Sequence, residues 1–272
     1  DASAIPSLLL SKHTSKHVTV ALSGDAGDEC FLGYNRYNSV NNISWIFNTP
    51  FSIRKYLSII FKFIPHDKAK LYHNFLRIKD RPSFYKKLIS TLNDSWLIDS
   101  SLGDITNYQN IFKTNKRFLH QVSDFDLKTY LNGDINTKVD RASMAFSLEA
   151  RSPLIDHRII EYSRSLPLDF KFKNSNKKRI LKDILFKYLP KDLFDRPKSG
   201  FTMPFEVWFR KDLKDYVLDS LTENNLKEVP NLNLNQVMKY IDDHMKGRHN
   251  RYNLIWKLLV LINWKNNNNA SF

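Results

Sequence analysis

The fold is decided by the stretch Val18-Thr19-Val20-Ala21-Leu22-Ser23-Gly24-Asp25-Ala26-Gly27-Asp28-Glu29. It opens with a short apolar run rich in β-branched residues, which predicts one buried strand near residues 17–22. A tight turn with two glycines and three carboxylates follows at once. In open α/β sheets ligands bind beyond the carboxyl ends of strands, and glycine lets backbone approach them closely. The stretch therefore predicts a strand that ends at a ligand.

The three carboxylates have two interpretations. If a helix begins near Asp25, then Asp25, Asp28 and Glu29 stand at i, i+3 and i+4 and share one face. Clustered carboxylates repel unless a cation joins them, and hard oxygen ligands beside phosphate suit Mg²⁺. Acidic residues in a first helical turn also complement the macrodipole and cap free N–H groups. From spacing alone, capping is the favoured interpretation.

Two later blocks change that balance. The first block is the opening stretch, which is followed by Gly33-Tyr34. The second block begins with Lys138-Val139-Asp140-Arg141-Ala142-Ser143-Met144 and continues to Leu148-Glu149-Ala150-Arg151-Ser152-Pro153. The third is Arg196-Pro197-Lys198-Ser199-Gly200-Phe201, followed by Pro204 and Trp208. In this order the blocks resemble the second nucleotide-site motif, the substrate segment and the lysine loop of the glutamine-hydrolysing asparagine synthetases. The resemblance covers nearly the whole chain.

The resemblance implies an α/β family whose synthetase domain is of the ATP pyrophosphatase type. Residues 1–272 would be the C-terminal part of that one domain, mostly α-helical with a single parallel-sheet strand near 17–22, and 38–120 would be a variable helical region. The family's N-terminal glutaminase domain and its Ser-Gly-Gly-x-Asp-Ser pyrophosphate loop do not occur in this sequence, which begins at Asp1. We therefore expect the chain alone to be inactive.

The implied reaction is ATP-dependent amidation of a carboxylate through an acyl-adenylate, with ATP and Mg²⁺ as cofactors and ammonia from glutamine. Aspartate is the favoured acceptor. Asp25 stands where well-known bacterial members have glutamate, so another carboxylate, such as a uronic acid in surface-polysaccharide synthesis, is the alternative. By resemblance, each predicted site residue has a role: catalysis by Lys198, Asp25 and Glu149, nucleotide binding by Ser23, Gly24, Lys178 and Lys182, substrate binding by Asp140 and Asp28, and metal binding by Asp28 and Glu29.

Some of these residues also have structural interpretations. Lysines at i and i+4, such as Lys178 and Lys182, most often form a solvated helix face. Asp140 and Glu149 are nine residues apart and would lie on opposite faces of an unbroken helix. Pro153 disfavours helix just before it, so an earlier helix end could bring Glu149 to the site. Glu149 and Arg151 could equally form a structural ion pair.

Composition sets the remaining bounds. The chain has 272 residues, 42% of them hydrophobic, which is enough for a substantial core. Its single cysteine, Cys30, follows the turn and carboxylates of residues 23–29, which we call the acidic motif. Cys30 lies beside Phe31 in the sequence and is expected to be a buried thiol. No apolar run approaches the roughly 20 residues that span a bilayer, so we expect no membrane partner and a cytoplasmic location. The eight histidines show no metal-ligand spacing.

The net charge of +14 raises the question of nucleic acid. The basic residues are scattered and match no zinc, RNP or helix-turn-helix pattern. Nucleic-acid binding, by a basic module that has lost the chemistry, is therefore the less favoured interpretation. A homodimer of the full protein is left open.

The rest of the chain is predicted to be mainly helical. Asn132-Gly133-Asp134 predicts a turn before the helix that carries Asp140. The other predicted helices cover 3–15, 27–37, 52–63, 68–76, 83–92, 124–130, 176–188, 204–218, 234–245 and 251–264.

Overall fold

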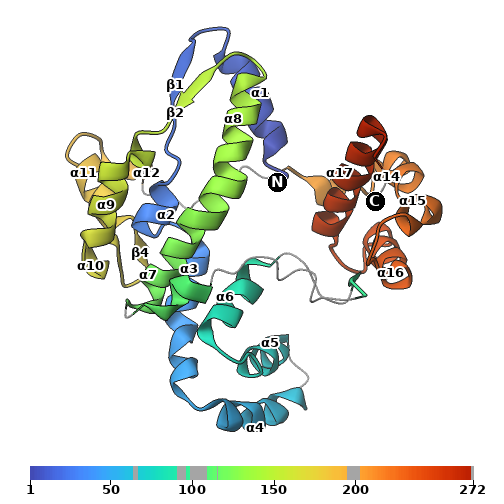
Figure 1. The fold of residues 1–272 in the computed structure, drawn as a ribbon, viewed down its shortest axis with the longest axis horizontal. Coiled ribbons are helices and arrows are strands. Elements are labelled where there is room, and N and C mark those ends of the chain that lie inside the picture. The colour runs from blue at the N-terminus through green and yellow to red at the C-terminus, as the bar shows by residue number, and fades with distance from the viewer. Residues whose placement is uncertain (64–66, 91–95, 99–108, 115, 195–202, 271–272) are drawn as a thin grey trace. The chain divides into compact units, whose positions relative to one another are not determined.

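A computed structural model describes residues 1–63, 67–90, 96–98, 109–114, 116–194 and 203–270. The chain divides into two compact units (Figure 1). The first consists mainly of Ser3–Ile89 and Tyr108–Gly200, and the second of Ser90–Asn107 and Phe201–Phe272. Helices dominate both units, as predicted, and the described strands are few and short.

The predicted parallel strand is β1, Val20–Leu22. Its predicted burial is wrong, because Val20 and Leu22 are exposed in a sheet of two strands. Its partner is β2, Glu149–Arg151, and the two pair in parallel with Ala21 opposite Ala150. This partner was not anticipated, because three residues are too few to show a strand pattern in the sequence. Helix α1 (Ala4–Thr14) packs against α8 (Thr137–Met144), and both lie beside the two strands (Figure 1). The first and second sequence blocks therefore meet in this small sheet.

One long helical run leads into the second block. Helix α7 (Phe118–Asp126), the π-helical segment η5 (Leu127–Asn136) and α8 follow one another without a break. The turn predicted at Asn132-Gly133-Asp134 is therefore wrong. Leu131 is buried within this segment, and its packing outweighs the local turn preference of the Asn-Gly pair.

The core of the first unit includes residues of the predicted variable region, 38–120, so that region is part of the packed fold. Helices α3 (Asn35–Ile43), α6 (Arg81–Ile89) and α7 contribute to this core. Strand β3 (Phe172–Lys173), which pairs antiparallel with β4 (Asn176–Lys177), also contributes. The buried residues of this core are Leu32, Tyr37, Val40, Phe84, Tyr85, Leu119, Val122, Phe125 and Phe172.

A second core cluster lies directly behind the acidic motif. It contains Ala26, Cys30, Phe31 and Leu131. Three of these belong to or adjoin α2 (Gly27–Phe31), the short helix that the motif begins. Cys30 is a free, buried thiol, as predicted, and burial raises its pKa. The motif thus lies on top of packed apolar residues, which fix its position.

The remaining elements of the first unit are helical segments, and several of them lie within the predicted variable region. They are η1 (Ser44–Asn48), α4 (Phe51–Lys62), α5 (Asp67–Leu76), η4 (Gln109–Lys113), η6 (Pro153–Ile155), α9 (His157–Ser165), α10 (Leu168–Lys171), α11 (Arg179–Leu185) and α12 (Lys191–Phe194).

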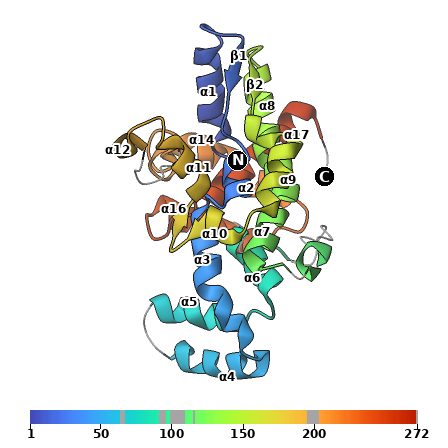
Figure 2. The same cartoon turned by 90° about the vertical axis from the view of Figure 1, so that its left-hand side faces the viewer.

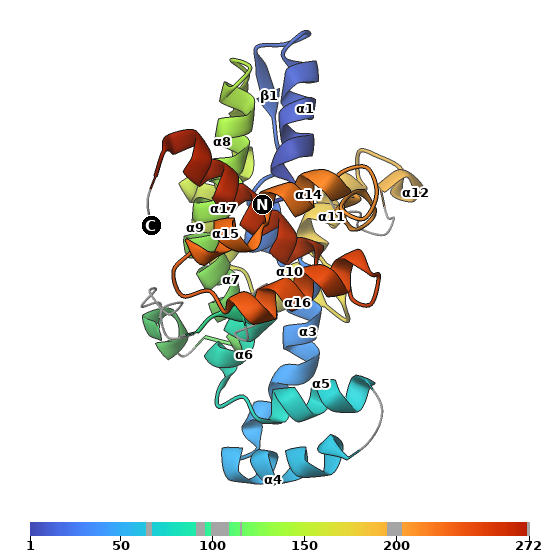
Figure 3. The same cartoon turned by 90° about the vertical axis from the view of Figure 1, so that its right-hand side faces the viewer.

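The second unit is a cluster of helices (Figure 3). Phe205 stacks on Phe209 and on Trp256, with centroid distances of 4.9 and 4.7 Å, and His244 is buried beside them. The helix predicted over 204–218 is interrupted between Trp208 and Lys214. The helices of the second unit are α13 (Phe205–Trp208), α14 (Lys214–Ser220), α15 (Glu223–Lys227), α16 (Leu234–Met245) and α17 (Tyr252–Asn268). Among the described residues of the chain, no helix is both long and apolar enough to cross a bilayer.

Candidate functional site

The parallel pairing of β1 and β2 brings the two sequence blocks to one place. Because both strands run in the same direction, their carboxyl ends meet at the same edge. The pairing continues one residue further, where the Ser23 N–H donates to the Arg151 carbonyl at 2.8 Å. Ser152 then donates its hydroxyl to the Asp25 carbonyl at 2.7 Å. The turn of the first block is thus fixed against the segment that leaves the second.

A pocket of about 210 Å³ opens at this edge. Four of the residues predicted from the sequence line it: Ser23, Asp25, Asp140 and Glu149. Asp140 and Glu149 meet there because α8 ends at Met144 and the chain returns in β2, so the two residues never share one helix. The rest of the lining was not predicted and consists of Asn136, Val139, Ser143, Met144, Ala150, Ser152 and Ile155.

The pocket is acidic. Its lining contains the carboxylates of Asp25, Asp140 and Glu149 and no lysine or arginine. Ser23 donates its hydroxyl to Asp25 Oδ2 at 2.8 Å. Glu149 accepts from Arg151 Nε at 2.7 Å, and this hydrogen bond and the charge of Arg151 lower the pKa of Glu149. Such a lining suits a ligand that presents an ammonium group or hydroxyl donors.

Asp28 lies away from this pocket and pairs with a lysine of another element. Its Oδ1 is 2.7 Å from Nζ of Lys178. Lys178 has a left-handed backbone with φ of 53° just before α11, and its N–H donates to the Phe31 carbonyl. A Cβ on Gly33 would overlap both Asp28 Oδ1 and Lys178 Cε. Because Gly33 has no side chain, the Asp28 and Lys178 side chains can occupy this space and form the ion pair.

The predicted lysine pair is thus divided between two environments. Lys178 contacts the acidic motif, and a Cβ on Gly27 would lie 3.7 Å from its Nζ. Lys182 starts one turn later, with Nζ 3.5 Å from Asn176 Oδ1. Gly24 has open space on the side where a Cβ would stand, with no atom within 4 Å. In this structure the space beside Gly24 is available to a ligand.

Glu29 points into the core and not into the pocket. It is 1% exposed and accepts a short hydrogen bond from the Tyr34 hydroxyl. Burial raises the pKa of Glu29, although the Tyr34 hydrogen bond acts in the opposite direction. Asp28 and Glu29 therefore each have a protein partner and do not converge on one point. Within the described residues, no group of three or more His, Cys, Asp or Glu side chains could hold a metal ion.

Tyr34 is held in turn by a cluster that the sequence analysis missed. The Arg36 guanidinium lies 3.8 Å from the Tyr34 ring centroid and pairs with Asp126 at 2.9 Å. Asp126 is fully buried and also accepts from the hydroxyls of Tyr37 and Tyr85, at 2.6 and 2.5 Å. The only local signal was the run Tyr34-Asn35-Arg36-Tyr37 after the motif.

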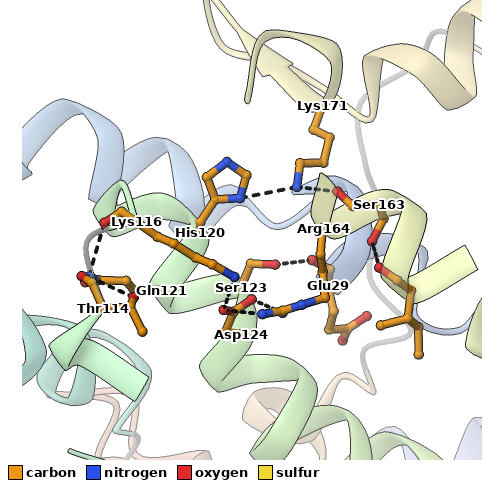
Figure 4. Close-up of polar contacts among 11 residues, drawn as sticks. Glu29, Thr114, Lys116, His120, Gln121, Ser123, Asp124, Ser163, Arg164 and Lys171 are labelled. Atoms are coloured by element: carbon orange, nitrogen blue, oxygen red, sulfur yellow. Dashed lines mark hydrogen bonds and ion pairs between the residues drawn. The ribbon is translucent and has the colours of Figure 1, made fainter. Parts of the chain in front are cut away.

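A second polar network lies behind the motif (Figure 4). Ser123 donates its hydroxyl to the Glu29 carbonyl at 2.8 Å, and the next residue, Asp124, pairs with Arg164. The ammonium of Lys171, which is 1% exposed, donates to the Ser163 carbonyl at 2.8 Å and lies 3.3 Å from His120 Nδ1.

This network changes the titration of its basic groups. Burial lowers the pKa of Lys171 to about 8, although the Asp124 carboxylate acts in the opposite direction. Burial and the Lys171 charge lower the pKa of His120 to about 4. The network fixes α7, α9 and α10 against the motif and does not line the pocket.

The structure therefore brings Ser23, Gly24, Asp25, Asp140 and Glu149 to one edge of the sheet. Asp28 and Lys178 pair nearby, whereas Glu29 lies in the core. Lys198 is outside the described residues. The missed pocket residues, such as Asn136 and Ser143, lie one turn or less from Asp140 on the same helical run, and that spacing could have identified them.

Comparison with known proteins places these features in a family. The family model for asparagine synthase matches residues 1–266. The chain is 26% identical over 276 aligned positions to asparagine synthetase [glutamine-hydrolyzing] 1 of Bacillus subtilis. It is 25% identical over 273 positions to a putative asparagine synthetase [glutamine-hydrolyzing] of Mycobacterium tuberculosis. Each alignment covers 97% of this chain.

The coverage of the relatives is smaller. The chain spans 43% of the Bacillus protein and 42% of the Mycobacterium protein. The mouse asparagine synthetase [glutamine-hydrolyzing] is 39% identical over 87 residues, which are 29% of this chain and 15% of that protein. No solved structure gives a significant match.

Proposed function

Because this chain belongs to the asparagine synthase family, we propose that it supplies the acceptor-substrate side of an ATP-dependent synthetase site in a longer protein. The observation that supports this most directly is the pocket at the carboxyl ends of β1 and β2. Ser23 and Asp25 from the first block line it together with Asp140 and Glu149 from the second. Two blocks more than a hundred residues apart in the chain thus contribute to one small cavity.

The proposed reaction is the amidation of aspartate. Ammonia does not displace oxide from a free carboxylate, because oxide is a poor leaving group. The carboxylate therefore attacks the α-phosphate of ATP, which forms an acyl-adenylate and expels pyrophosphate. Ammonia derived from glutamine then attacks the acyl carbon, forms the amide and expels AMP.

The pocket residues have separate roles in this proposal. Asp140 and Glu149 accept hydrogen bonds from the ammonium group of the acceptor, which matches the acidic lining. Ser23 and Gly24 border the nucleotide, and Asp25, held by Ser23, fixes the turn beside the acyl phosphate. A fixed cation close to the reacting phosphate stabilises the negative charge that develops there, and Lys198 is the proposed source.

Lys178, Lys182 and Mg²⁺ remain predictions. Lys178 would have to leave Asp28 to contact a phosphate, and Asp28 and Glu29 would have to leave their protein partners to bind an ion. Mg²⁺ is commonly held by one or two carboxylates together with substrate phosphates. A Mg²⁺ ion bound at these carboxylates would neutralise charge on the pyrophosphate.

A uronic acid is the second candidate acceptor. Sugar hydroxyls would also donate to Asp25, Asp140 and Glu149, and the lining contains no lysine or arginine that singles out an amino acid. The two acceptors are separated by assaying pyrophosphate release with each one in the presence of ATP and ammonia.

The test uses the full protein that contains this chain. We expect Asp140→Asn to lower kcat/KM for the acceptor at least about tenfold, because a neutral amide replaces the carboxylate and the hydrogen bond to the ammonium loses its charge assistance. Asp134→Asn is the matched control, since Asp134 lies in the same helical run and does not line the pocket. Equal kcat/KM for the two variants would remove Asp140 from the site. Tight RNA binding without any pyrophosphate release would favour the basic binding module instead.

We also propose that residues 1–272 alone do not catalyse adenylation. The described pocket contains no lysine or arginine for a pyrophosphate group. Leu22 is 75% exposed in a two-stranded parallel sheet, a type of sheet that is normally covered on both faces. Exchange of labelled pyrophosphate into ATP by the purified chain would refute this proposal.

A further inference from the structure

Helix α4 (Phe51–Lys62) is built with its polar side inward. The two residues that it buries are Arg54 and Ser58, which are 3% and 0% exposed. A helix of a water-soluble protein ordinarily buries its apolar stripe and exposes its polar one. The packing of α4 is the reverse of that arrangement.

Polar contacts hold the two buried residues of the inward face, and beside them the Phe61 ring packs against Tyr72 of α5 with a centroid distance of 5.7 Å. Arg54 donates Nε to the Thr49 carbonyl at 3.0 Å, Nη1 to the Ile78 carbonyl at 2.7 Å and Nη2 to the Lys79 carbonyl at 2.9 Å. The Ser58 carbonyl lies 2.7 Å from Nδ1 of a histidine on α5. These contacts fix the rotation of α4 about its axis, and the outward face is fixed with it.

The outward face is apolar. At 100° per residue its side chains cover an arc of about 160°. Figures 1 and 2 show α4 at one end of the first unit, with α5 beside it. The exposed side chains are Ile53 at 50%, Tyr56 at 72%, Leu57 at 39%, Ile59 at 48%, Ile60 at 56% and, just after the helix, Phe63 at 77%.

The flank of this face is basic. Lys55 and Lys62, seven residues apart, are both exposed and lie between the buried face and the apolar arc. The sequence from 51 to 79 contains seven Lys or Arg and one Asp. A helix with a broad apolar face, aromatic residues and flanking lysines is the pattern that lies in the plane of a membrane interface.

We propose that α4 binds the surface of a membrane rich in anionic lipid. The apolar arc enters the boundary between headgroups and acyl chains, while Lys55 and Lys62 contact the lipid phosphates. A second copy of this chain fits the face less well, because it would bring two basic segments together. No bilayer-spanning run is needed, so the absence of such a helix among the described residues is compatible with this binding. The proposal replaces the expectation of no membrane partner, which rested only on the lack of a spanning run.

The experiment is flotation of the full protein with phosphatidylcholine vesicles, prepared with and without phosphatidylglycerol. We expect binding to the anionic vesicles only, and weaker binding at high salt. The double substitution Ile60→Asp and Phe63→Asp should reduce the partition coefficient at least about tenfold. The double substitution Lys55→Gln and Lys62→Gln should reduce it roughly fivefold per lysine. Val260→Asp is the control, since Val260 is 47% exposed on α17.

Three results would overturn the proposal. The first is no flotation with anionic vesicles. The second is flotation that the α4 substitutions leave at the level of the Val260→Asp control. The third is a dimer, detected by light scattering, that the α4 substitutions dissociate while vesicle binding is absent, which would identify a second copy as the occupant. Circular dichroism checks that each variant is folded, since all the replaced side chains are exposed.

Discussion

The buried ammonium of Lys171 gives a quantitative prediction about stability. Burial lowers its folded-state pKa from 10.5 to about 8. Below pH 8 the lysine is protonated in both states, and the folded state is destabilised by the buried charge. Between pH 8 and 10.5 the unfolded chain binds more protons than the folded one, so stability must rise with pH. Above 10.5 the contribution is constant.

The size of the effect follows from the two pKa values. The free energy of unfolding should rise by about 1.3 kcal/mol between pH 7 and 9, and by about 2.5 kcal/mol between pH 7 and 10, from this one group. Lys171→Met removes the titrating group and should abolish that rise. Lys173→Met is the matched control, because Lys173 lies two residues further along the chain, in β3, and is exposed.

The assay is urea unfolding of wild type and both variants at pH 7, 8, 9 and 10. Cys30 is replaced by alanine in all three, because its thiol is close to the same network and burial raises its pKa. The difference in unfolding free energy between wild type and Lys171→Met should increase with pH, while the difference for Lys173→Met stays flat. A flat difference for both variants would show that the ammonium of Lys171 is not destabilised by burial.

Three further predictions concern packing around the site. Gly33→Ala should destabilise the chain by about 1–3 kcal/mol, because its Cβ would overlap the Asp28 carboxylate, whereas Gly24→Ala, with open space, should change the free energy of unfolding by less than about 1 kcal/mol. Asp126→Asn should cost about 3–5 kcal/mol in thermal or chemical denaturation, since it leaves a guanidinium half-buried without its counter-charge, and a cost below about 1 kcal/mol would contradict this. Leu22→Ser should leave the urea unfolding midpoint of the isolated chain nearly unchanged, because Leu22 is exposed on the small sheet, and a large drop in the midpoint would contradict this.

The sequence predicted the parts of the site that depend on neighbouring residues. The strand before Ser23, the tight turn after it and the burial of Cys30 all follow from local composition and are present in the structure. The resemblance of three blocks to one family was also available from the sequence, and the family match over residues 1–266 confirms it. These features are local because each depends on a few adjacent residues.

Other features required the fold. The sequence spacing of Asp140 and Glu149 argued against a shared pocket unless the helix ended, and in the structure α8 ends at Met144 before β2 pairs with β1. The three carboxylates of the motif looked equivalent, yet Asp25 lines the pocket, Asp28 pairs with Lys178 and Glu29 lies in the core. Their directions depend on the turn of α2 and on side chains from distant segments.

The sequence by itself therefore determined the family, the strand and turn of the motif, and the mainly helical character of the chain. Only the tertiary structure decided which carboxylates face the pocket, why Arg54 turns inward on α4, and how Lys171 comes to be buried. The reason is physical: periodicity and turn preference act within a few residues, whereas burial, charge pairing and pKa depend on groups that the folded chain brings together from far apart.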